Sequence, residues 1–260
     1  MNIGQLHSWT VTPREAVRIQ EQIRALVIPR GRVPRPKLVA GADAAFDLRA
    51  GVVYAAVVVL AYPDLEILET VVSRHRLSFP YVPGLLSFRE APALLRAFSK
   101  LRHEPDIVFV DGHGLSHPRS AGLACHIGIC LEKPTIGCAK SRLIGAYREP
   151  GPKRGATSPL LSRDKQVIGS VLRTCDNVRP VFVSVGHRVG LAQAVRLTLS
   201  CGRGYRIPEP TRQADILAER AKREAAGSEW PVASDPRSRV SRKPLSPLYL
   251  EGKQKLVGPT

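Results

Sequence analysis

Hydrophobic and polar positions along the chain follow two periods, one typical of strands and one typical of helices. Apolar or alternating runs predict strands over residues 38–46, 52–62, 67–77, 107–110, 134–139, 167–172 and 181–185. Apolar positions at helical spacing predict helices over residues 13–27, 86–101, 120–131, 190–199 and 211–226. Residues 147–165 are rich in Gly, Pro, Ser and basic side chains, which favours a surface hairpin or a loop.

The order of these elements predicts an α/β fold. Three successive strands with short links predict an antiparallel meander, and a helix, a strand and then alternating helices and strands follow. This order predicts a mixed central β-sheet flanked by helices on both faces. We expect one domain over residues 1–227. Beyond Gly227 the chain turns to Pro, Ser, Arg and Lys, which predicts a basic, flexible C-terminal tail over residues 228–260.

Composition indicates which kind of molecule the protein binds and in which cellular compartment it acts. The chain has 260 residues, with 39 Lys and Arg against 22 Asp and Glu, and a net charge of +17. This imbalance favours nucleic acid as the partner, but it does not separate DNA from RNA. Five cysteines without C-x-x-C spacing predict reduced core residues. Without a membrane span or a leader pattern, we expect a cytoplasmic protein that contacts no membrane, needs no obligate protein partner and acts as a monomer.

The first candidate for chemistry is Asp111, which ends the apolar run of residues 107–110 and precedes a loop rich in Gly and His. An open α/β sheet presents its chemistry at the carboxyl ends of its strands, although an Asp before a Gly also suits a plain turn. Asp43, within the first strand, and Glu90, in the first turn of the helix over 86–101, support the chemical alternative. If the two strands are neighbours, these three acids meet.

Such an acidic cluster needs a cation, because like charges at close range raise one another's pKa. Hard carboxylate oxygens suit Mg²⁺ or Mn²⁺. Beside a basic surface, this predicts metal-assisted hydrolysis of a phosphodiester bond. Lys140, which follows the strand over 134–139, is then a candidate for orienting the nucleophile or stabilising the transition state.

Two further groups of residues are candidates for substrate contact. Pro80 and Pro83 flank Tyr81 in a stiff loop, which holds the ring outward unless the loop is a plain turn with a half-buried Tyr. His113 and His117 have the spacing of a helical zinc pair, but the glycines around them and the proline after them disfavour a helix. We therefore expect them near the substrate or behind the metal ligands.

Taken together, these motifs resemble the endonuclease V family over about residues 10–225. The matching segments are VAGAD at 39–43, PYVPG at 80–84, FRE at 88–90, DGHG at 111–114, HPR at 117–119, GCAKS at 137–141 and SVGHR at 184–188. The resemblance implies a ribonuclease H-like fold and Mg²⁺-dependent hydrolysis, with Mn²⁺ able to substitute. It implies cleavage of DNA at the second phosphodiester bond 3′ to a deaminated adenine, deoxyinosine, leaving 3′-hydroxyl and 5′-phosphate ends and initiating repair.

The resemblance also implies roles for individual residues. Asp43, Asp111 and Glu90 become the metal ligands, and Lys140 and His117 resemble the active-site lysine and histidine of the family. Tyr81 resembles the wedge that fills the gap left by the extruded base. The expected pocket for hypoxanthine involves backbone groups of Gly84, Gly112, His113 and Gly114.

One position departs from the bacterial pattern. Asp215 stands where many members have a histidine, and an acid there resembles the animal members, which prefer inosine-containing RNA. Asp215 is therefore a candidate fourth carboxylate near the metal. Two alternatives stay open beside the DNA enzyme: an inosine-specific endoribonuclease acting on single-stranded RNA, and a noncatalytic protein that binds nucleic acid.

Overall fold

The computed structural model describes residues 1 and 3–227 of the chain. The basic tail expected over residues 228–260 lies outside the described residues. No helix within the described part is long and apolar enough to cross a membrane. The five cysteines carry free thiols, and four of them are buried, as the sequence predicts.

Each predicted helix and strand is present. The helices are α1 (Pro13–Leu26), α2 (Ser87–Phe98), α3 (Leu123–Leu131), α4 (Leu191–Ser200) and α5 (Glu209–Ala226). The strands are β1 (Leu38–Asp47), β2 (Val52–Ala61), β3 (Ile67–Arg76), β4 (Ile107–Val110), β5 (Thr135–Ala139), β6 (Thr157–Leu161), β7 (Val167–Leu172) and β8 (Val181–His187). Within residues 147–165, for which a hairpin or a loop was expected, residues 147–156 form a loop and residues 157–161 form β6, which pairs with β7 in a hairpin.

Two helix starts differ from the prediction by more than one residue. Helix α3 begins at Leu123 rather than at residue 120, where Ser120 has a positive φ of 49° and cannot continue a helix. Helix α5 begins at Glu209, before the predicted residue 211. Its Pro210 lies in the first turn, where the missing N–H has no helical partner to lose.

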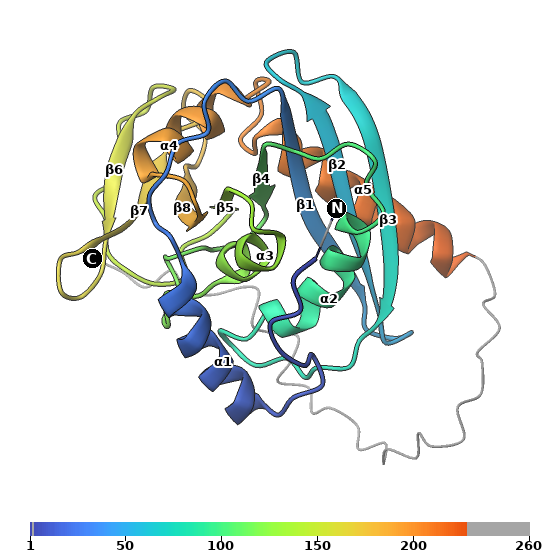
Figure 1. Cartoon of the computed structure of the whole chain (residues 1–260). Helices are drawn as coiled ribbons and strands as arrows, with labels where there is room; N and C mark the ends of the chain where they lie inside the picture. The colour runs from blue at the N-terminus through green and yellow to red at the C-terminus, as the bar shows by residue number, and fades with distance from the viewer. Residues whose placement is uncertain (2, 228–260) are drawn as a thin grey trace, which may run out of the picture. The chain divides into compact units, whose positions relative to one another are not determined.

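The eight strands form one mixed sheet in the order β3-β2-β1-β4-β5-β8-β7-β6. Strands β1, β4 and β5 run parallel, and the pairs toward both edges are antiparallel. Figure 1 shows β3 and β6 at opposite ends of the sheet. The carboxyl ends of the three parallel strands therefore lie next to one another along one side of the sheet, in its middle part.

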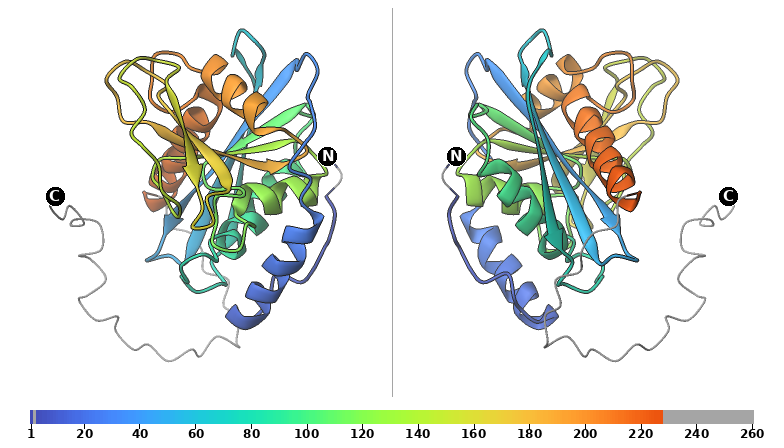
Figure 2. Two further views of the ribbon diagram at one scale, coloured as in Figure 1. Left: turned by 90° about the vertical axis from the view of Figure 1, so that its left-hand side faces the viewer. Right: turned by 90° about the vertical axis from the view of Figure 1, so that its right-hand side faces the viewer.

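Helices cover both faces of the sheet, as predicted. Ala40 and Ala42 of β1 pack into a core with α2 and α3, and Val39 packs into a second core with α4 and α5. Figure 2 shows α5 across the strands from α1, α2 and α3. At Gly41 the approach of α5 is so close that a Cβ atom would lie 1.8 Å from the Pro210 carbonyl oxygen. This contact places the first turns of α5 directly over β1.

Helix α1 packs against α3 on the outer side of the domain. Thr12 and Glu15 form a capping box at its start. The buried positions are Ala16, Gln20 and Ile23, whereas the apolar Leu26 is 52% exposed. The helix therefore buries a polar side chain at the centre of its inner face.

Candidate active site

Asp43 and Asp111 lie side by side at the carboxyl edge of the parallel strands. The β1–β4 register pairs Ala42 with Val110, so each Asp follows a paired residue. The Asp111 N–H continues the ladder by donating to the Ala42 carbonyl at 3.0 Å. Asp43 is buried, and burial together with the charges of Asp111 and Glu90 raises its pKa well above the ordinary value. The pair of acids predicted from the sequence is therefore brought together by strand pairing.

Glu90 reaches the same edge from the first turn of α2. Its side chain is buried, and Oε2 has no hydrogen-bond partner among the described residues. Burial and the charge of Asp111 raise the pKa of Glu90 to about 8, although Arg89 and Lys140 oppose the shift. A buried carboxylate oxygen without a partner is unfavourable, and it is a donor atom still available to a cation.

Lys140, the residue after β5, stands among the carboxylates. Its Nζ lies 2.6 Å from Oδ2 of Asp111, 3.3 Å from Oδ2 of Asp215 and 4.0 Å from Oδ2 of Asp43. Burial alone would lower the pKa of Lys140, but these carboxylates outweigh it and raise the pKa. Asp215 therefore belongs to the site through its ion pair with Lys140. This contact is possible because α5, which carries Asp215, packs over β1.

The residues present fit a divalent cation. Among the residues described, no group of three or more His, Cys, Asp or Glu side chains is placed to hold a metal ion, because the Lys140 ammonium stands between the acids. The carboxylates nevertheless supply hard oxygen donors, and one of them has a free, buried oxygen. A divalent ion would offset the repulsion that raises the pKa values of Asp43 and Glu90.

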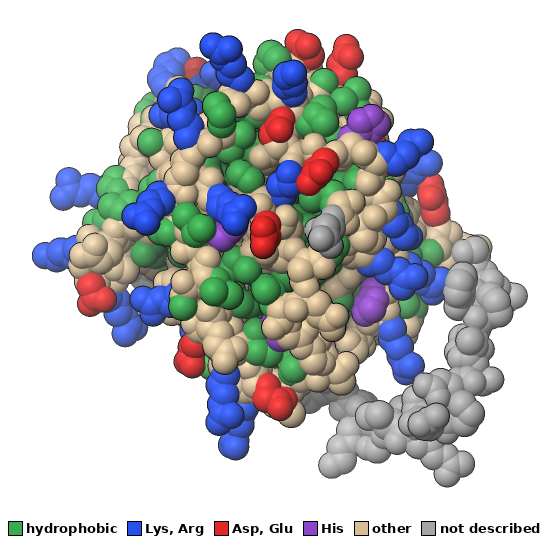
Figure 3. Space-filling model, viewed as in Figure 1, with side chains coloured by type: hydrophobic (Ala, Val, Ile, Leu, Met, Phe, Trp, Pro, Cys, Tyr) green, Lys and Arg blue, Asp and Glu red, His purple; other side chains and the backbone are tan. Residues whose placement is uncertain are grey.

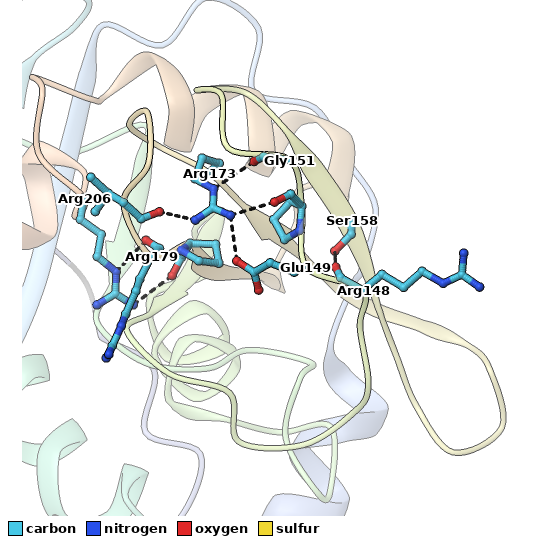
Figure 4. A network of polar contacts seen from close by, with 10 residues as sticks. Arg148, Glu149, Gly151, Ser158, Arg173, Arg179 and Arg206 are labelled. Carbon is cyan, nitrogen blue, oxygen red and sulfur yellow. Dashed lines mark hydrogen bonds and ion pairs between the residues drawn. The ribbon is translucent and has the colours of Figure 1, made fainter. Parts of the chain in front are cut away.

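The backbone of Lys140 is held by Arg206. The Arg206 guanidinium donates to the carbonyls of Lys140, Arg179 and Pro180. Figure 4 shows Arg206 beside a similar arginine, Arg173, whose guanidinium binds a set of backbone carbonyls and the Glu149 carboxylate. Arg206 therefore ties the end of β5, where Lys140 stands, to the start of β8.

Tyr81 is outward, as its proline-flanked loop predicts. Its side chain is 58% exposed, and the Arg89 guanidinium lies 5.7 Å from the ring centroid. Arg89 precedes Glu90 on α2, so the exposed ring stands near the acidic edge. An exposed aromatic ring beside such an edge is suited to stack on a base.

Comparison with known proteins identifies the family. The endonuclease V family model matches residues 21–216. Endonuclease V of Roseiflexus castenholzii is 50% identical over 216 residues, which are 83% of this chain and 96% of that protein. The chain belongs to the endonuclease V family.

Solved structures agree with this membership. The crystal structure of Streptomyces avermitilis endonuclease V matches with a TM-score of 0.81 and 43% identity, covering 87% of this chain and all of that one (100%). Ciona intestinalis endonuclease V, crystallised with a 24mer DNA containing an inosine followed by a ribo-adenosine, has a TM-score of 0.72 and 26% identity over 82% of this chain and 98% of that one. The ribonuclease H-like α/β fold expected from the sequence is confirmed, and the chain is an endonuclease.

Within this endonuclease V chain, the predicted histidines contact protein groups. The Nε2–H of His117 donates to the Gly84 carbonyl at 2.9 Å, and Nδ1 accepts from the Arg119 N–H at 3.2 Å. The ring of His113 bonds the Ser116 hydroxyl at 2.9 Å. Burial lowers the pKa of each histidine to about 4, so both rings are neutral at neutral pH.

The backbone groups expected to read the base are also engaged. The Gly114 N–H donates to the Ser184 hydroxyl at 2.9 Å, and its carbonyl accepts from the Gly122 N–H at 3.1 Å. A Cβ at Gly114 would lie 2.0 Å from the Val185 carbonyl oxygen, so this glycine allows the loop to rest on β8. The loop over 112–114 is thus fixed to the sheet, and its part in base recognition stays a prediction.

Sequence reasoning missed Gln20 and Arg206. Both bind backbone carbonyls in loops next to predicted site residues: Gln20 binds Gly84, and Arg206 binds Lys140. The signal for Gln20 was a polar residue at the centre of the helical stripe over 16–23. Arg206 belongs to a basic loop, and nothing in its spacing separates it from a solvated arginine.

Proposed function

We propose that the chain is a Mg²⁺-dependent endonuclease, active also with Mn²⁺, that cuts DNA at deoxyinosine. The cut falls at the second phosphodiester bond on the 3′ side of the deaminated adenine and leaves 3′-hydroxyl and 5′-phosphate ends, which initiates repair. The observation that carries the proposal is the convergence of Asp43, Asp111 and Glu90 at one sheet edge around Lys140.

One further observation supports DNA as the substrate, and a second supports nucleic acid in general. The Ciona intestinalis relative binds DNA that contains inosine. The chain has a net charge of +17, and Figure 3 shows Lys and Arg side chains spread over the face in view. Basic side chains neutralise backbone phosphates and release counterions, which favours binding of any nucleic acid.

Each acidic residue then has a task in hydrolysis. Asp43, Asp111 and Glu90 would hold the ion, which supplies an activated water and offsets charge on the phosphate. The Lys140 ammonium has three N–H donors, and it is held beside Asp111 where a phosphate oxygen would approach the acids. It stabilises the negative charge that develops in the transition state. Tyr81 stacks in the gap left by the extruded base.

The experiment is nicking of a labelled duplex that contains one deoxyinosine. Asp43→Asn and Asp111→Asn should abolish cutting and keep binding, because each removes one negative ligand and leaves the strands paired. Asp106→Asn is the matched control, since Asp106 lies before the same strand as Asp111 and binds the Lys37 and Leu38 N–H groups instead. Turnover like the wild type by both site variants would refute the proposal.

Asp215 favours a second candidate, cleavage of inosine in single-stranded RNA. Its carboxylate lies 3.3 Å from the Lys140 amine. The position at which this chain has an acid, as the animal members do, is therefore part of the site. A panel of matched duplex DNA, single-stranded DNA and RNA, each with one inosine, separates the two substrates. We expect Asp215→His to shift the ratio of rates toward DNA. Absence of metal-dependent cutting on the whole panel would support the noncatalytic alternative, and sedimentation of the same samples tests the proposed monomer.

A further inference from the structure

The Gly84 carbonyl, three residues after Tyr81, is held by three side chains. Gln20 Nε2 donates to it at 2.9 Å, His117 Nε2 at 2.9 Å and Arg119 Nη2 at 2.8 Å. A carbonyl oxygen has two lone pairs, so three donors fix it from several directions at once. Gly84 has a φ of +77°, and a Cβ there would lie 2.8 Å from Arg119 Nη2. Glycine at this position therefore allows the convergence.

Gln20 joins this carbonyl to two other parts of the chain. Its side chain is fully buried on α1, and Nε2 also bonds the Ala121 carbonyl at 3.2 Å. Its Oε1 accepts from Arg119 Nε at 2.5 Å, so Gln20 holds the guanidinium as well as the carbonyl that the guanidinium binds. One amide thus links α1, the Tyr81 loop and the loop over 117–121.

The anchor lies at the end of a short, stiff segment. Pro80 and Pro83 restrict the backbone around Tyr81, and the Leu85 N–H donates to the Val82 carbonyl at 2.9 Å, which closes a turn. In a stiff segment, the position of one end determines the position of the other. The orientation of the exposed Tyr81 ring is therefore set where Gly84 is held.

We propose that Gln20 is a positioning residue for Tyr81 and that it determines how well the protein acts on duplex DNA relative to single strands. The inference rests on the proposed function. A base in a duplex must leave its stack before it is read, and a wedge that fills the gap favours that step. A flexible single strand does not need the wedge, so loosening the Tyr81 loop reduces duplex cleavage selectively.

The experiment compares kcat/KM of the full chain on deoxyinosine in duplex and in single-stranded DNA. Gln20→Met keeps the volume and removes both hydrogen-bonding ends. It should lower the duplex value by about tenfold or more, the scale on which misplacement of a functional group acts, and the single-strand value by less than about threefold. The single-strand rate from the same preparation shows that the variant is folded.

The chain offers a matched control in Gln193. Its amide also makes two bonds across a loop, accepting from the Val33 N–H at 3.0 Å and donating to the Val33 carbonyl at 2.8 Å. Gln193→Met should leave the ratio of the two rates unchanged. Gln20→Glu keeps the acceptor for Arg119 and loses the donor to Gly84, so it should follow Gln20→Met.

A double variant tests whether Gln20 acts through the Tyr81 ring. In the background of Tyr81→Ala, Gln20→Met should cause no further loss on the duplex. Three outcomes would each overturn the inference and leave the proposed function standing. These are an additional tenfold loss in the Tyr81→Ala background, equal losses on both substrates for Gln20→Met, and wild-type behaviour of Gln20→Glu. A wild-type enzyme that cuts neither inosine substrate would overturn the proposed function, and the inference with it.

Discussion

Replacement of Lys140 by methionine should tighten the binding of a divalent ion while it abolishes turnover. The ammonium of Lys140 lies 2.6 Å from Oδ2 of Asp111 and 4.0 Å from Oδ2 of Asp43, so it shares the ligands that the ion requires. Any ion that enters meets a positive charge at close range. Methionine keeps the length of the side chain and removes that charge.

The expected magnitude follows from Coulomb's law. A single and a double positive charge about 4 Å apart repel by about 2 kcal/mol when water screens them. The screened value applies because the Lys140 side chain is 41% exposed, and movement of the flexible amine away from the ion reduces it further. We therefore expect Lys140→Met to gain about 1–2 kcal/mol, a dissociation constant lower by about five- to thirtyfold.

Isothermal titration of Mn²⁺ or Mg²⁺ into the protein without nucleic acid measures this change. Lys133→Met is the control, since Lys133 forms an ion pair with Glu104 at 3.0 Å, and neither residue is a candidate for the site. Its dissociation constant should match the wild type. Unchanged or weaker ion binding by Lys140→Met would show that the lysine and the ion do not compete for these carboxylates.

Three further changes test other parts of the structure. Burial would raise the pKa of Glu69, but hydrogen bonds from the residues at 102–103 lower it from 4.5 to about 2. Because folding lowers the pKa of Glu69, Glu69→Gln should lower the free energy of unfolding by about 1–3 kcal/mol at neutral pH. Urea titrations should show this difference disappear as the pH falls from 4.5 toward 2. A difference that does not depend on pH would contradict the prediction. Gly41→Ala should destabilise by about 1–3 kcal/mol or more, because its Cβ would meet the Pro210 carbonyl at 1.8 Å, and an unchanged Tm would count against that contact. Tyr81→Ala should lose about 1–3 kcal/mol of stacking on duplex substrates, measured as kcat/KM, and equal losses on single strands would argue against a wedge.

Much of the carboxylate cluster was predictable because it depends on strand order. Apolar runs located β1 and β4, with Asp43 within the first run and Asp111 directly after the second. The only assumption was that the two strands are neighbours, and the Ala42–Val110 register confirms it. Glu90 was harder, because a carboxylate in the first turn of a helix often serves only the helix dipole.

The hydrogen-bonded anchors were not predictable in the same way. Hydrophobic periodicity ranks positions by residue type, so Gln20 stands out only as a polar residue within an apolar stripe, and the pattern does not show that its side chain is buried and paired. For α1 the pattern favoured Val17, Ile19, Ile23, Leu26 and Val27. Ile23 is buried as predicted, but the other two buried positions are Ala16 and Gln20, and Leu26 is exposed.

Strand β6 was left open for a related reason. It lies at the edge of the sheet, with β7 as its strand neighbour, and Leu160 is the one buried residue among its five. Pro159 stands in its middle, which a central strand would not tolerate but an edge strand accepts. With one buried apolar residue and a proline in five positions, β6 carries little apolar signal, whereas the other edge strand, β3, is longer and was predicted.

The energetic cost of the acidic edge is the strongest argument that it serves a reaction. Burial and mutual repulsion raise the pKa values of Asp43 and Glu90, so keeping these acids together works against folding at neutral pH. Lys140 compensates for only part of this charge, and the buried Oε2 of Glu90 lacks a partner among the described residues. Stability therefore does not explain this placement, whereas the divalent ion that we propose for the site would offset the clustered charge.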